Sequence, residues 1–96
     1  MPQQASDHLM VVVLDNLVQH SLPRIFAIRK KLEKGEVLIS SEIEFFVAML
    51  DRVKRCQREF LHDPQCSVIF STVAHLLRKV ADLALKNEQA LSDEVA

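Results

Sequence analysis

The chain has 96 residues, a formal net charge of −1, one glycine and three prolines, and 49% of its residues are hydrophobic. This length suits one domain, residues 1–96, with a thin stability margin, because a chain this short buries only about two-thirds of the surface it exposes when unfolded. The near-neutral charge argues against a dedicated nucleic-acid binder, since affinity for nucleic acid comes mainly from neutralising phosphates.

The N-terminal residues 1–6 are polar, and we expect them to be disordered. They lack the basic start and apolar core of a signal peptide. The longest apolar runs, 9–14 and 45–50, have six residues, whereas a membrane-spanning helix needs roughly 18 or more. We therefore expect a cytoplasmic protein that does not associate with membranes.

The first predicted helix begins at Ser6 or Asp7, either of which can cap it. Its apolar side chains recur at helical spacing and are Leu9, Met10, Val13, Leu14, Leu17 and Val18. Pro23 must bend or end the helix, because its ring has no N–H and clashes with the preceding turn. We favour one bent helix over residues 7–34, since an apolar stripe continues past the proline. The alternative is a turn there, with Ser21 capping a new helix.

Gly35 is expected to end this helix in the left-handed conformation. Residues 40–61 form the predicted central helix, with Ser41 and Glu44 as a capping box. Its predicted buried face consists of Ile43, Phe46, Val47, Leu50, Val53, Phe60 and Leu61. A second apolar stripe lies beside this face and consists of Phe45, Met49 and Cys56.

The apolar sector of the central helix is therefore wider than one neighbouring helix can cover. We expect a second subunit or another protein to contact Phe45 and Met49. Arg52, Arg55 and Arg58 would form a polar rim around that contact surface. A homodimer is the simplest arrangement, although an unidentified protein partner would serve equally well.

The last predicted helix starts after Asp63, with Pro64 in its first turn, and runs to about Leu91. Its predicted seam consists of Ile69, Val73, Leu76, Val80, Leu83 and Asn87. Flanking positions are Phe70, Leu77, Ala84 and Leu91. Residues 92–96 are expected to be disordered. The chain thus predicts an all-α antiparallel bundle of three long helices, or a four-helix bundle with two short N-terminal helices if Pro23 is a turn.

Few residues suggest catalytic or metal chemistry. Cys56 and Cys66 are expected to be small core residues rather than a disulfide, because antiparallel helices hold them too far apart. Glu59 and His62 form one Glu-x-x-His pair, but a bundle metal site needs two. We predict no metal, no cofactor and no enzymatic activity. The charge is uneven, however: a basic middle, 24–58, could attract the acidic tail, 82–96, or an acidic partner.

The segment from Ala74 to Lys79 resembles the phospho-accepting motif of histidine phosphotransfer domains. The resemblance implies that His75 accepts a phosphoryl group and that Arg78, one turn later on the same side, stabilises it. Lys79 departs from the motif, because those domains have glycine there to open access to the ring. Only the 21 residues after His75 remain to supply further helices.

Two longer segments, HSLPRIFAIRKKLEKGE at 20–36 and LALKNE at 83–88, resemble a small all-helical bacterial protein family without an assigned function. That resemblance implies an all-α fold and a bacterial cytosolic setting. We therefore expect a non-enzymatic helical module for self-association or protein binding, with phosphotransfer through His75 as the alternative.

Overall fold

The computed structural model describes the backbone of residues 2–95 and the side chains of residues 9–94. Its helices are α1 (Pro2–Asn16), the π-helical turn η1 (Leu17–Ser21), α2 (Leu22–Glu33), α3 (Ser40–Glu59) and α4 (Pro64–Val95). The described residues contain no strand. Since α1, η1 and α2 follow one another without a break, the fold has three long helices, which confirms the predicted all-α bundle.

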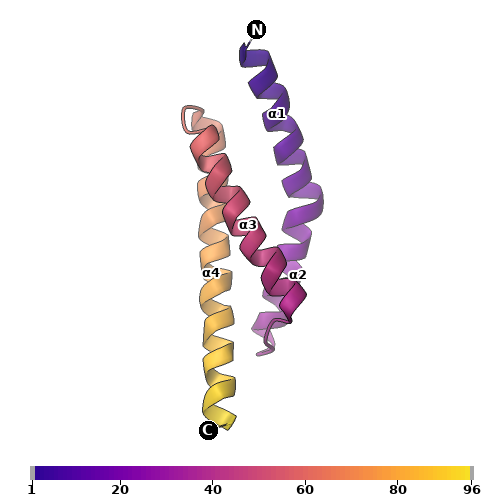
Figure 1. The fold of residues 1–96 in the computed structure, drawn as a ribbon, viewed down its shortest axis with the longest axis vertical. Helices are drawn as coiled ribbons and strands as arrows, with labels where there is room; N and C mark the ends of the chain where they lie inside the picture. Colours follow the sequence, from indigo (N-terminus) through magenta and orange to yellow (C-terminus); the bar gives the residue numbers. More distant parts are fainter. Residues whose placement is uncertain (1, 96) are drawn as a thin grey trace.

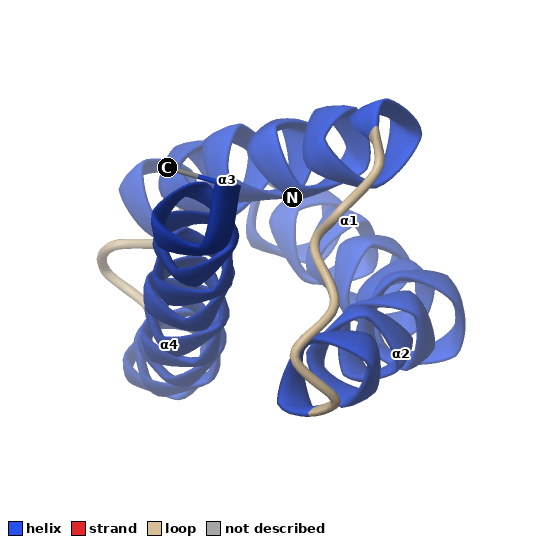
Figure 2. Cartoon of the chain, turned by 90° about the horizontal axis from the view of Figure 1, so that it is seen from below, coloured by secondary structure: helices blue, strands red, loops and turns tan. Residues whose placement is uncertain are grey.

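Each long helix runs opposite to the one before it (Figure 1). Viewed end-on, α4 and the first helix stand as two columns, with α3 laid across them (Figure 2). The molecule is elongated, with extents of 60 × 21 × 17 Å. None of the helices, over the residues described, combines the length and the apolar composition that crossing a bilayer requires.

The π-helical turn η1 explains how the first helix passes Pro23. The N–H of Leu22 donates to the carbonyl of Leu17, five residues earlier. This wider turn fits one extra residue just before the proline, where the ring would otherwise meet the carbonyl four residues back. The helix bends gently there (Figure 1) instead of ending. Pro23 therefore bends the helix, and the four-helix alternative is not adopted.

Both chain ends are more helical than the sequence predicted. The first turn of α1 includes residues 2–6, and α4 continues through residues 92–95, whereas we predicted disorder for 1–6 and 92–96. Met1 and Ala96 lie outside the described residues. Pro2 occupies the first helical position, which proline favours. No glycine or proline follows Leu91, so no local signal ends α4 there.

Gly35 ends α2 as predicted. Its φ is +85°, and its N–H donates to the carbonyl of Leu32 at 2.9 Å. An added Cβ would meet no atom within 4 Å, so only the backbone requires glycine. We expect Gly35→Ala to lower the free energy of unfolding by about 1 kcal/mol, because non-glycine residues are strained in the left-handed region. Urea unfolding checks this, and Gly35→Asn, which tolerates this conformation better, should lose less than Gly35→Ala.

The start of α3 differs from the prediction by two residues. Ile39 is the N-cap residue, and Glu42 accepts a hydrogen bond from the Ile39 N–H at 2.9 Å. Ser41 and Glu44 therefore do not form a capping box. Glu42 is favoured over Glu44 as the capping carboxylate because Lys31, at the end of α2, donates to the same Glu42 oxygen at 2.7 Å. One carboxylate thus caps α3 and joins it to α2.

The Glu42 carboxylate makes stability depend on pH. Its pKa is lowered from the usual value of 4.5, first by the Lys31 hydrogen bond and then by the Ile39 N–H. A lowered folded-state pKa stabilises the protein above pH 4.5, and this contribution is lost as the pH falls through the folded-state pKa. We expect Glu42→Gln to cost about 1 kcal/mol at pH 7 and less at pH 3.

Urea unfolding of Glu42→Gln at both pH values tests this expectation. Glu44→Gln is the matched control, because Glu44 is exposed on the same helix. Equal losses for the two variants at pH 7 would contradict the role of Glu42.

Two further polar contacts fix the ends of α4. Asp63 Oδ1 accepts hydrogen bonds from the N–H groups of Gln65 and Cys66, at 3.0 and 3.1 Å, which confirms the predicted cap. Near the other end, Asn87 Nδ2 donates to the carbonyls of Leu32 and Glu36, at 2.8 and 2.9 Å. The amide of Asn87 therefore holds α4 against the end of α2 and the loop after it.

The core confirms part of each predicted face, since Val73 and Val80 on α4 and Phe46 and Val53 on α3 are buried, but its centre is rotated from the predicted one. On α4 the buried side chains are Cys66, Phe70, Val73, Leu77 and Val80. Leu76 is only half-buried and Ile69 is exposed, although both belong to the predicted seam. On α3 the buried side chains are Phe46, Met49, Val53 and Cys56. Ile43, Val47 and Leu61, predicted to be buried, are exposed.

Candidate functional site

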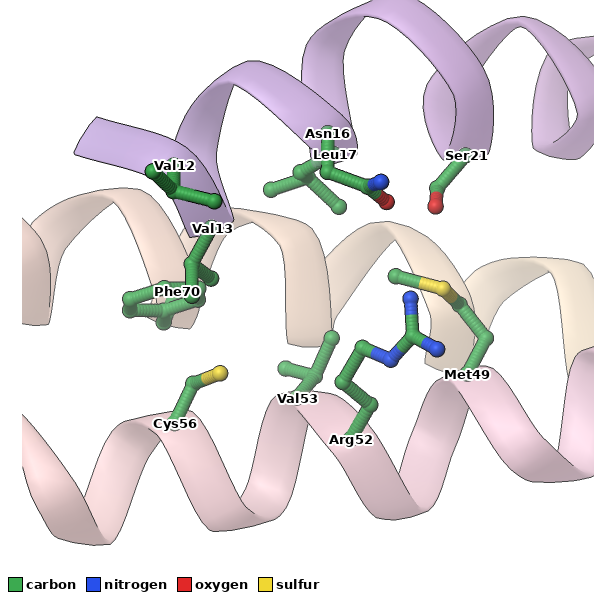
Figure 3. A pocket seen from close by; sticks show the side chains of 10 residues that line it. All are labelled: Val12, Val13, Asn16, Leu17, Ser21, Met49, Arg52, Val53, Cys56 and Phe70. Carbon is green, nitrogen blue, oxygen red and sulfur yellow. The ribbon is translucent and has the colours of Figure 1, made fainter. Parts of the chain in front are cut away.

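A cavity of about 280 Å³ lies between the first helix and α3, with α4 behind it (Figure 3). Most of its wall is apolar and consists of Val12, Val13, Leu17, Met49, Val53, Cys56 and Phe70. Three polar side chains complete the lining, namely Asn16, Ser21 and Arg52. All three long helices therefore contribute to this site.

The turn η1 places the polar side chains from the first helix. Its extra residue rotates the helix, so that Leu17, Ser21 and then Ile25 face inward in sequence. Ser21 is only 4% exposed, and its hydroxyl is directed at the cavity (Figure 3). Among the described residues, no buried side-chain nitrogen or oxygen atom lacks a hydrogen-bond partner. The Ser21 hydroxyl is therefore not an unsatisfied buried group, but it is a polar atom placed at the cavity wall.

Arg52 reaches into the cavity from α3. Its guanidinium group lies beside Met49 and below Asn16 and Ser21 (Figure 3). Within the described part of the chain no carboxylate lies within salt-bridge distance of Arg52, whereas Arg55 on the same helix pairs with Asp51 at 3.1 Å. The cavity therefore carries one positive charge at its polar end without a protein counter-ion.

The thiol of Cys56 lies at the apolar end of the cavity. Burial raises the pKa of this thiol, and the nearby charge of Glu59 raises it further. The thiol thus stays protonated near neutral pH and is a poor nucleophile. Both Cys56 and Cys66 are buried and free, which confirms the prediction that they are core residues without a disulfide.

The predicted contact surface on α3 is not assembled. Met49 is 3% exposed and belongs to the core, so its assignment to an exposed surface is wrong. Phe45 is half-buried, with the guanidinium of Arg24 lying 4.1 Å from its ring centroid. The reason is that α3 turns its second apolar stripe toward the first helix and α4. Arg52, Arg55 and Arg58 are all exposed, but only Arg52 lines the cavity.

Exposed apolar side chains occur on all three long helices, and one group of them lies on the first helix. Its exposed members are Leu9, Val11, Val12 and Val18, each more than half exposed, and we call them the α1 patch. Residues 9–14 are apolar all round the helix, yet Met10, Val13 and Leu14 alone turn to the core and are only partly buried. A helix that is apolar on every side is normally buried on every side.

The residues suggested for other chemistry are scattered. His75 and Arg78 are both exposed on α4, and phosphotransfer through His75 stays a prediction. Glu59 ends α3 and His62 lies in the turn that follows. Over the described residues, no three His, Cys, Asp or Glu side chains are placed to share a metal ion.

A second hollow, of about 490 Å³, lies between the loop after α2 and the end of α4. Lys31 and Glu94 both line it, but Lys31 pairs with Glu42. In the part of the chain that the structure describes, no ion pair joins the basic middle to the acidic C-terminal turn. Lys31 and Glu94 line the same hollow, but they do not form an ion pair with each other.

No protein-family model matches the chain, and no curated protein or solved structure matches it.

Sequence analysis missed the cavity and the α1 patch. The available signal was the apolar run at 9–14, in which Val11 and Val12 fall outside the apolar positions assigned to the first predicted helix. No local pattern identifies Ser21 or Asn16 as cavity residues, because their placement depends on the rotation at η1.

Proposed function

We propose that the protein is a non-enzymatic helical module of the bacterial cytosol that works as a homodimer through the α1 patch. The surplus of exposed surface in a single chain carries this proposal. One chain exposes 7015 Å², whereas a folded monomer of 11.0 kDa is expected to expose about 5,600 Å². Its radius of gyration of 15.8 Å likewise exceeds the roughly 12.5 Å expected for 96 residues.

The size of the surplus suits a second copy. It amounts to about 1,400 Å² per chain, and a stable interface of standard size covers about 800 Å² per partner. The α1 patch is an apolar part of the exposed surface, and exposing apolar surface to water is unfavourable by roughly 25 cal/mol per Å². Covering the α1 patch by association would therefore stabilise the protein.

The α1 patch can pair with a copy of itself. A two-fold symmetric interface brings the same surface from both subunits together, so a charge near the axis would face its own copy. The run at 9–14 has no ionisable side chain, whereas Asp15 lies one turn after Val11 on the same side of the helix. Two such runs can therefore pack without electrostatic repulsion where the two-fold axis passes within residues 9–14, away from Asp15.

Light scattering coupled to gel filtration tests the proposal directly. We expect a mass of about twice 11.0 kDa at tens of micromolar chain. A mass of one chain throughout the micromolar range would overturn the homodimer. In that case the α1 patch would have to serve another protein.

A further inference from the structure

We propose that the cavity between α1 and α3 binds a small straight-chain carboxylate, its headgroup at Arg52 and Ser21 and its tail toward Phe70. This site adjoins the proposed dimer surface and shares Val12 with it. Neither Val11 nor Val18 lines the cavity. Val11 also lies about 160° around the helix from Val13, at 100° per residue, so a dimer contact centred on Val11 leaves the cavity lining other than Val12 in place.

The apolar walls select the tail. The residues that line the cavity at this end, including Cys56 and Phe70, are uncharged, and its volume of about 280 Å³ is just below the roughly 300–1,000 Å³ usual for small-molecule sites. A flexible unbranched chain can follow such a narrow space between helices. A bulky ring system or a folded peptide segment would need a larger one.

The polar end selects the headgroup. Ser21 is only 4% exposed as a residue, and its hydroxyl is directed at the cavity (Figure 3), where it can hydrogen-bond a ligand oxygen. The guanidinium of Arg52 supplies two parallel donors, which match the two oxygens of a carboxylate. Asn16 adds an amide next to them (Figure 3).

The charge count favours a carboxylate over a phosphate monoester. Arg52 is the one cation among the ten lining residues, and none of the ten is acidic. One guanidinium balances the single negative charge of a carboxylate. A phosphate monoester carries up to two charges at pH 7, and the second would remain unbalanced beside an apolar wall.

Calorimetric titration with octanoate tests the proposal. Octan-1-ol is the control ligand without the negative charge, and acetate is the control ligand without the apolar tail. We expect octanoate to bind saturably and more tightly than either. Arg52→Gln should weaken octanoate binding about tenfold and leave octanol binding unchanged. Ser21→Ala should weaken octanoate about threefold. Arg58→Gln, on the same helix but outside the cavity, is the matched control and should bind as the wild type does.

Three results would overturn the inference: equal affinities for octanoate and octanol, unchanged binding by Arg52→Gln, or equal weakening by Arg58→Gln. Methyl NMR adds a check of position, since octanoate should shift the signals of Val13 and Val53. Shifts confined to Val11 and Val18 would place the ligand on the α1 patch and also overturn it. Val11→Glu should still bind octanoate, so a failure of the homodimer proposal is distinguishable from a failure of this one.

Discussion

The Val11→Glu variant is expected to be a monomer at concentrations where the wild-type protein is a dimer. Val11 is 59% exposed in the single chain, so glutamate there meets water and costs the folded monomer little. Glutamate is also a better helix former than valine. In the dimer the same side chain would bring two uncompensated charges into an apolar contact, one from each subunit, which is strongly unfavourable.

We expect the dissociation constant of the dimer to rise at least about 100-fold, which corresponds to roughly 2.7 kcal/mol. Sedimentation equilibrium over a range of chain concentrations measures it. Ala27→Glu is the matched control, because Ala27 is exposed on α2 and lies outside the α1 patch. An unchanged dissociation constant for Val11→Glu, or an equal rise for Ala27→Glu, would show that the α1 patch is not the interface.

The Leu77→Ala variant is expected to lose about 3–4 kcal/mol of unfolding free energy, whereas Leu76→Ala should lose about 1 kcal/mol. Leu77 is fully buried, and Leu76 is only half-buried. The two substitutions remove the same atoms from adjacent positions of α4, so the change in helix propensity is the same. The difference between them therefore measures which face of α4 enters the core.

Urea unfolding at one fixed chain concentration makes this comparison, because dimerisation adds a concentration-dependent contribution to stability. The slope of the free energy against urea should be the same for both variants, since the fold is unchanged. A larger loss for Leu76→Ala would restore the seam predicted from the sequence. The free energy of unfolding of a small domain is only roughly 5–15 kcal/mol, so Leu77→Ala is also expected to lower the unfolding temperature by many degrees.

The two α4 leucines show why the predicted face of α4 was only partly correct. Leu76 and Leu77 are both apolar and both recur at spacings of three and four with other apolar residues. The periodicity of apolar residues therefore fits either face of α4. Adjacent residues point in directions 100° apart, so choosing the neighbouring residue moves a side chain from the core to its edge. On α3 the same ambiguity led us to expect Met49 outside and Val47 inside, while the structure has the reverse.

At Pro23 the sequence showed that the helix must be interrupted, but not whether it bends or ends. The missing N–H and the ring clash are local facts, and they required either a bend or an end. The choice depended on distant residues, because Leu17 before the proline and Ile25 after it both pack into the same core. Burying both sides keeps the helix continuous and makes the π-helical turn the less costly solution.

The sequence by itself determined the all-α class and the boundaries at Gly35 and at Asp63 with Pro64. The Gly35 boundary depends on one backbone conformation, and the Asp63 boundary depends on hydrogen bonds between residues at most three apart. A short stretch of sequence is sufficient to specify both. The tertiary structure decided how each helix is rotated, where the cavity lies and which apolar surface stays uncovered. Rotation is fixed only when side chains of separate helices fill one shared core, and no single segment contains that information.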